Sequence, residues 1–312
     1  MKLLLLLLTL STLAAGGQPQ GGTAADFKAR YERQVKAVGP AGLGVESILD
    51  RWEAAFPKDP EMLDARFLWA YNKSQKTEVT VKNQERFMGG KPLLSLPDSL
   101  APGGKRNYFE EIIFDPELYA SACLYIDRAI REQPHELKYR FDKISALISY
   151  EKESPDMTTD EIRTLLDYNA SASPQWTFRG KKAGTDVFKA AIQEYLFTFF
   201  RIGSPECFES FKNLSEKALG YWPKDPVFLD NIGSWYLVAK KNHPAALKCY
   251  KKVLKIAPDD YTAIKNILII ARSDKDVKLE KKYLQKLIKV AETDAEKSSA
   301  QARLDYLNGK KK

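Results

Sequence analysis

Apolar residues recur at intervals of three and four positions along almost the whole chain. Phe27, Tyr31, Val35 and Val38 are one example, and they fall on a single face of a helix. The strict alternation of apolar and polar residues that marks a half-buried strand is nearly absent. The pattern therefore predicts a series of helices without a sheet, over residues 24–38, 44–56, 60–74, 116–133, 135–152, 159–171, 185–202, 205–220, 226–241, 244–256, 261–273, 277–292 and 295–307.

Several of these helices have clear start signals. Asp59, Asp115 and Asp225 each stand directly before a proline, and Ser204 does the same. Such a side chain can accept hydrogen bonds from the first helical amides, and proline suits the first turn because it has no amide hydrogen to leave unpaired. We therefore expect helices to begin immediately after these four residues.

The sequence also repeats itself. Residues 57–64 (PKDPEMLD) return at 223–230 as PKDPVFLD, and Trp69 has a counterpart in Trp235 at the same offset of 166. A looser copy begins at Pro258, 35 residues after the start of the second copy. A period of this length indicates an array of stacked helix pairs.

The clearest unit of this array, residues 229–258, resembles a tetratricopeptide repeat (TPR). The resemblance is carried by two helices, at Leu229, Ile232, Gly233 and Tyr236 and then at Ala246, Tyr250, Val253 and Pro258. Small residues let the two helices approach closely, and the proline ends the second helix. The resemblance implies an all-α fold, a TPR-like right-handed solenoid of antiparallel helix pairs, formed by residues 18–312 with the best-matching repeats at 223–292.

Two long interruptions depart from a regular array. Residues 75–114 are broken by glycine and proline, so we expect an irregular loop insertion over 74–115. The second spans residues 172–184 and contains Trp176, Phe178 and Arg179. A tryptophan in such a loop either plugs the helical array or is exposed as a contact for a ligand. Both insertions are candidate functional segments, because long loops inside a domain are often functional.

The N-terminus looks like a targeting segment. Lys2 is followed by an apolar run from Leu3 to Leu8 and by small residues from Ala14 to Gly17. We therefore expect a signal peptide at residues 1–17, and a protein exported to the periplasm or secreted, as in a Gram-negative bacterium. No cysteine stands at the expected cleavage point, so a lipoprotein is not expected. The apolar run is shorter than the roughly 20 residues that span a bilayer.

Composition and charge narrow the function classes. The chain is 44% hydrophobic and 29% charged, as in ordinary globular proteins. Its net charge is +8, and the basic excess is densest from Lys275 to Lys312. We interpret this excess as a solvated helix face, with weak contact of the basic C-terminus with anionic surfaces as the alternative. An exported protein meets little nucleic acid, so no such partner is expected.

No arrangement of residues points to catalysis, a metal or a cofactor. The two histidines, His135 and His243, each lie beside a proline at a helix start, which leaves no catalytic triad and no zinc motif. The three cysteines are far apart and fit small buried side chains, although one pair could form a disulfide. Glu110 and Glu111 could act as acid and base on a glycan, but carboxylates near helix starts are better explained by the helix dipole. We predict that the protein is not an enzyme.

The concave side of a stacked array is lined by the first helix of each pair and suits an extended peptide. The TPR resemblance implies groove positions at Asp230, Asn231, Ser234 and Leu237, followed by Lys265, Asn266 and Ile269. The leading hypothesis is therefore an exported, non-catalytic scaffold or adaptor that binds a protein or peptide partner in the cell envelope.

Two alternatives belong to other classes. The first is a protein that binds a glycan or small ligand in a pocket built from loops 75–114 and 172–184, with Trp176 and Tyr108 as stacking platforms. Phe178 and Arg179 would then join Trp176 as ligand contacts. The second is a structural spacer, which would have a featureless groove.

Overall fold

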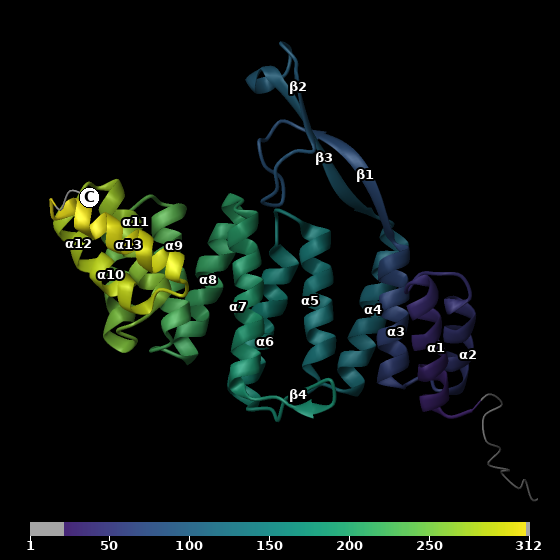
Figure 1. The fold of residues 1–312 in the computed structure, drawn as a ribbon. Coiled ribbons are helices and arrows are strands. Elements are labelled where there is room, and N and C mark those ends of the chain that lie inside the picture. The colour runs from purple at the N-terminus through teal and green to yellow at the C-terminus, as the bar shows by residue number, and fades with distance from the viewer. Residues whose placement is uncertain (1–21, 310–312) are drawn as a thin grey trace, which may run out of the picture. The chain divides into compact units, whose positions relative to one another are not determined.

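The computed structural model describes residues 22–309, which form thirteen α-helices, one short 3-10 helix and five strands (Figure 1). The predicted helices are confirmed, with ends that differ by a few residues. The expected signal peptide at 1–17 lies outside the described residues. In the described part of the chain, no helix combines the length and the apolar character that crossing a membrane requires.

Two compact units divide the described chain. One consists of residues 22–75 and 115–134, and the other of residues 76–114 and 135–309. The repeat pattern alone predicts one continuous domain over residues 18–312, and it gives no sign of this division.

The first unit is built from two helix pairs. They are α1 (Ala24–Val38) with α2 (Val45–Ala55) and α3 (Pro60–Lys73) with α4 (Pro116–Glu132). Asp59 caps α3 as predicted, and its carboxylate accepts both the amide of Glu61 and the indole N–H of Trp52 at 2.9 Å. Trp52 is almost fully buried and stacks on Phe27. One capping residue therefore joins the start of α3 to the core between α1 and α2.

The segment between α3 and α4 is a three-stranded sheet. Its strands are β1 (Gln75–Lys82), β2 (Leu94–Pro97) and β3 (Lys105–Phe114), in the order β1–β3–β2, with a 3-10 helix at Pro102–Gly104. β2 and β3 run antiparallel, with Leu94 opposite Tyr108. The expectation of an all-α fold with an irregular insertion over 74–115 is therefore corrected. β1 and β3 are rich in β-branched and aromatic residues, a strand-favouring composition that the glycines and prolines between them obscure.

The helices of the second unit follow one another in pairs. They are α5 (Leu137–Glu151), α6 (Asp156–Ala172), α7 (Thr185–Ile202), α8 (Pro205–Tyr221), α9 (Pro226–Val238), α10 (His243–Ile256), α11 (Tyr261–Ser273), α12 (Val277–Val290) and α13 (Asp294–Leu307). Ser204 and Asp225 cap α8 and α9 as predicted, because their side chains accept the amides of Cys207 and Val227. The start signals in the sequence thus correspond to real capping hydrogen bonds.

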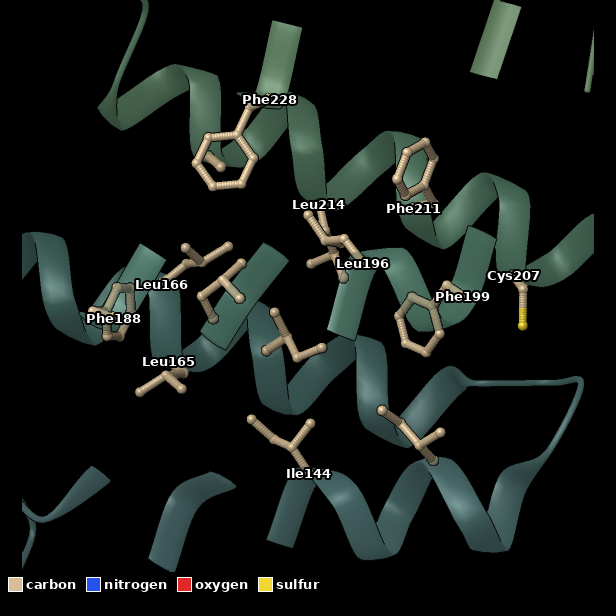
Figure 2. Close-up of a cluster of buried hydrophobic side chains, with 14 of the residues drawn as sticks. Ile144, Leu165, Leu166, Phe188, Leu196, Phe199, Cys207, Phe211, Leu214 and Phe228 are labelled. Carbon is tan, nitrogen blue, oxygen red and sulfur yellow. The ribbon is translucent and has the colours of Figure 1, made fainter. Parts of the chain in front are cut away.

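The core of the second unit runs from one helix pair to the next. Figure 2 shows part of it, where Ile144 of α5, Leu166 of α6, Phe188 of α7 and Phe228 of α9 are all almost completely buried. A second cluster joins α10, α11, α12 and α13. Each helix therefore packs against neighbours on two sides, as in an array of stacked pairs.

The pair α9–α10 has the close approach that the TPR resemblance implies. A Cβ atom added to Gly233 of α9 would lie 2.6 Å from the ring of Tyr250 on α10. Ala246, Tyr250 and Val253 of α10 are fully buried in this contact region. Glycine is therefore required here by space, because any side chain would displace the tyrosine.

The second insertion contains a small hairpin. β4 (Thr177–Phe178) and β5 (Lys181–Lys182) are antiparallel and joined by Arg179 and Gly180, whose φ angles are 52° and 72°. Such a pair of positive φ values is typical of the tight turns that join two strands. The buried carboxylate of Glu136 accepts both turn amides, at 2.8 Å and 3.0 Å. Burial alone would raise the pKa of Glu136, but these backbone hydrogen bonds lower it.

Candidate functional site

The predicted groove residues lead to a small hollow formed by α11, α12 and α13 (Figure 1). The hollow has a volume of about 180 Å³. Its apolar wall consists of Leu268, Leu287 and Ala300, which are buried, and of Ile269, which is 53% exposed. An exposed isoleucine above buried apolar side chains offers a surface on which an apolar side chain of a partner would lose water.

Charged side chains surround this apolar wall. Lys265 lies 3.1 Å from a carboxylate oxygen of Glu296 and donates a hydrogen bond of 2.7 Å to the hydroxyl of Tyr261. Tyr261 in turn donates to Glu296 at 2.8 Å. The hydrogen bond from Tyr261, followed by that from Lys265, lowers the pKa of Glu296, and the same contacts raise the pKa of Lys265. One edge of the hollow is therefore a fixed ion pair, charged at neutral pH.

The helices around the hollow are held together by a second set of charges. Glu280 of α12 is only 3% exposed and accepts hydrogen bonds from Arg272 of α11 at 2.9 Å and from Arg303 of α13 at 3.0 Å. The hydrogen bonds from Arg303 and Arg272 lower the pKa of Glu280 against the effect of burial. Removal of this carboxylate would leave two arginines without their shared partner, so we infer that Glu280 fixes the shape of the hollow.

Two predicted groove residues lie in the interior. Asp230 and Asn231 are each 6% exposed. The side chain of Asn231 exchanges hydrogen bonds with Gln193 of α7 at 3.1 Å and 2.8 Å and also contacts Ser215 of α8. The expectation that Asp230 and Asn231 line an open groove is therefore corrected. Asn231 joins α9 to the preceding helix pair.

The other predicted groove residues are divided. Ser234 is half-buried, with its hydroxyl 3.2 Å from that of Tyr250, and Asn266 also bonds to Tyr250. Lys265 and Ile269 do line the hollow. Tyr261 and Glu296 complete its charged edge and were not expected from the sequence. Glu296 belongs to α13, where the repeat pattern has faded, so only its helical spacing after Thr293 could have indicated its place.

The candidate residues of the second loop are mostly structural. Trp176 is 4% exposed, stacks on Phe188 and donates its indole N–H to Asn169 at 2.8 Å. Phe178 is half-buried against Phe141, and Arg179 forms the hairpin turn. Of the two interpretations of Trp176, the structure agrees with the plug.

The alternative pocket built from both insertions does not form. The hairpin contacts Glu136, just before α5 begins, whereas Gln84 of the sheet insertion bonds to Glu153, just after α5 ends. α5 has 15 residues, which corresponds to a separation of about 22 Å. Trp176 and Tyr108 therefore cannot stack on the same small ligand.

The sheet insertion does enclose a cavity of its own, of about 290 Å³, beside α5. Its wall includes Glu111, which is 8% exposed and receives hydrogen bonds from Lys152, Lys82 and Thr80. Burial would raise the pKa of Glu111, but these contacts lower it to about 2. Glu111 is therefore ionised at neutral pH, when a general acid would have to carry a proton, and its neighbour Glu110 is exposed.

The described residues also contain no group of three or more histidine, cysteine, aspartate or glutamate side chains placed to hold a metal ion.

Comparisons with known proteins give little beyond this geometry. No model of a protein family and no curated protein matches the chain. Among solved structures, it is similar to pilF of Pseudomonas aeruginosa, with 9% identity, 90% of this chain and 97% of that chain covered, and a TM-score of 0.34. It is also similar to the flexible tandem repeat domain of a bacterial cellulose synthase, with 13% identity, coverage of 92% and 98%, and a TM-score of 0.25. At such scores the description of the fold rests on the helix pairs themselves.

Proposed function

We propose that this protein is a non-catalytic helical-repeat scaffold, and that it binds a peptide segment of a protein partner at the hollow between α11, α12 and α13. The observation that carries the proposal is the 53% exposure of Ile269 over buried apolar side chains, next to the fixed pair of Lys265 and Glu296. An apolar anchor with polar groups at its edge is the usual composition of a binding hot spot.

The surface next to the hollow supports an extended partner. Val227, Ser234 and Val238 of α9 are spaced seven and four residues apart, so they share one face of that helix. Val227 and Val238 are 43% and 45% exposed. Ile269 stands one repeat of 35 residues after Ser234. The first helices of two successive pairs thus present apolar side chains at equivalent positions, as a peptide that crosses both helices would require.

Two further elements of the proposal rest on the sequence. The TPR resemblance of residues 229–258 supports a right-handed solenoid of helix pairs, whose concave side would include Ile269. The apolar run and small residues within 1–17 support export, which would place the partner in the cell envelope.

A photocrosslinking experiment tests the proposed site. A photoreactive phenylalanine analogue is introduced at Ile269 and, as a matched control, at Leu124, an aliphatic residue of the first unit that is 66% exposed. The proposal predicts a crosslink from position 269 to a defined peptide of one partner, and none from position 124.

The peptide identified in this way provides the second step. Its synthetic form should bind the unmodified protein and bind the Ile269→Asp variant at least about tenfold more weakly, because a carboxylate would be desolvated against the apolar wall. The Leu124→Asp variant should bind like the unmodified protein. Identical crosslinks from both positions, or equal affinity of the Ile269→Asp variant, would exclude this hollow as the binding site.

A further inference from the structure

One face of α10 is covered by lysines. A shallow hollow of about 570 Å³ lies on this helix alone and is lined by Pro244, Leu247, Lys248, Lys251, Lys252 and Lys255. All four lysines are exposed. Their spacing of three and four residues places them on one stripe that is about 10 Å long.

The stripe has no acidic counterpart. α10 contains no aspartate or glutamate, and none of the salt bridges in the described part of the chain involves its four lysines. Other exposed helices pair such charges within one turn, for example Lys138 with Asp142 at 2.6 Å. Like charges three and four residues apart repel each other and weaken a helix. A sequence selected for stability alone would therefore place an acid among them, as it does elsewhere.

The basic surface continues beyond α10. Between Lys240 and Glu292 the chain has fourteen lysines and arginines and six acidic residues, so this stretch carries a net charge of +8, equal to that of the whole chain. α12 contributes five of these lysines, at positions 278, 281, 282, 286 and 289. Its single acid, Glu280, is buried and already shared by Arg272 and Arg303.

We propose that the lysine surface of α10 and α12 docks on an anionic phospholipid bilayer. The complement of such a surface must be a broad array of negative charges. The hollow on α10 has walls from a single helix, so nothing faces it that could clamp a peptide. A planar layer of anionic headgroups needs no second wall and engages many lysines at once. The lysines stand on the second helices of their pairs, so docking leaves Ile269 on α11 accessible.

The test compares two variants of the purified protein with the same change in charge. In one, Lys248, Lys251, Lys252 and Lys255 are all replaced by glutamine. In the matched control the same replacement is made at four exposed lysines elsewhere, at positions 36, 58, 181 and 224. Co-sedimentation is measured with vesicles of phosphatidylcholine alone and of phosphatidylcholine mixed with phosphatidylglycerol, at low and at high salt.

The unmodified protein should bind only the anionic vesicles and should be released at high salt. Each lysine at the surface contributes about a fivefold factor in partition, so the α10 variant should lose at least about 100-fold while the control loses only a few-fold. The proposal is overturned if the unmodified protein ignores anionic vesicles at low salt, or if both variants lose equally. Binding of soluble polyglutamate without binding of vesicles would also overturn it, and would indicate an acidic protein partner.

Discussion

The buried carboxyl group of Asp230 should make the stability of the second unit depend on pH. Asp230 is 6% exposed, and its Oδ1 atom has no hydrogen-bond partner within the described structure. The neighbouring Asp260 caps α11, since its Oδ1 accepts the amide of Ala263 at 2.8 Å. Burial first, and then the charge and hydrogen bond of Asp260, raise the pKa of Asp230 from 3.8 to about 8. The folded protein therefore keeps a proton on Asp230 at neutral pH.

The direction of the effect follows from proton linkage. Below pH 3.8 both the folded and the unfolded chain hold this proton, so Asp230 causes no pH dependence there. Between pH 3.8 and about pH 8 only the folded chain holds it, and the free energy of unfolding falls by about 1.4 kcal/mol for each pH unit. The loss between pH 4 and pH 7 is roughly 4 kcal/mol. Replacement by asparagine removes the titration, while its amide can still donate to Asp260.

The Asp230→Asn variant should therefore unfold close to the unmodified protein at pH 4 and at clearly higher urea concentration at pH 7. The assay is urea unfolding followed by circular dichroism at several pH values between these limits. Asp259→Asn, at an exposed carboxylate of the same turn, is the matched control and should show no such trend. A constant difference between variant and unmodified protein across this pH range would refute the reasoning, because it would show that Asp230 does not titrate there.

Two further variants test contacts that the structure shows directly. Gly233→Ala should destabilise the protein by about 1–2 kcal/mol in urea unfolding, because its Cβ would lie 2.6 Å from the ring of Tyr250 and the overpacking exceeds the roughly 1 kcal/mol that alanine gains in a helix; an unchanged or higher midpoint would show that the ring moves aside without cost. Glu111→Gln should cost about 2 kcal/mol at neutral pH, because two lysines lose their carboxylate. Since the pKa of Glu111 is lowered to about 2, its contribution is complete above pH 4.5 and fades as the pH falls, so the difference from the unmodified protein should narrow in acid; a similar loss in Glu110→Gln would contradict this assignment.

The helices were predictable because their signals are local. Asp59 and Asp225 accept amides of the first turn in the structure, as the Asp-Pro pairs predict. The strands were not predictable in the same way. Val79 and Val81 of β1 are 64% and 50% exposed, so no buried face gives that strand a clear period of two. Its partner β3 is separated from it by more than twenty residues, and only the pairing makes either a strand.

The candidate site was only partly predictable, because a repeat pattern describes one helix pair at a time. The position of Asn231 on α9 marks it as facing away from α10, which in an isolated pair would be solvent. In the structure Gln193 of α7 and Ser215 of α8 cover that side. Ile269, at the next pair, is not covered in this way and stays 53% exposed. Burial at a groove position thus depends on which helix precedes it, a non-local property.

The sheet insertion interrupts a helix pair without ending it. The first helix of the TPR-like pair, α9, matches α3 at an offset of 166 residues. Its second helix, α10, matches α4 at a smaller offset, because Ala246, Tyr250 and Pro258 stand 124 residues after Ala122, Ile126 and Pro134. The difference corresponds to the length of the segment that holds the sheet.

The two ends of this segment meet, since the amide of Asp115 donates to the carbonyl of Ser74 at 2.8 Å. α3 and α4 can therefore pack as the two helices of one pair although the sheet separates them in the sequence. The pair also exchanges volume with its copy. Where α9 and α10 have Gly233 and Tyr250, α3 and α4 have Phe67 and Ile126, both buried. A large residue on the first helix is matched by a smaller one on the second, so the space between the helices is filled in both pairs.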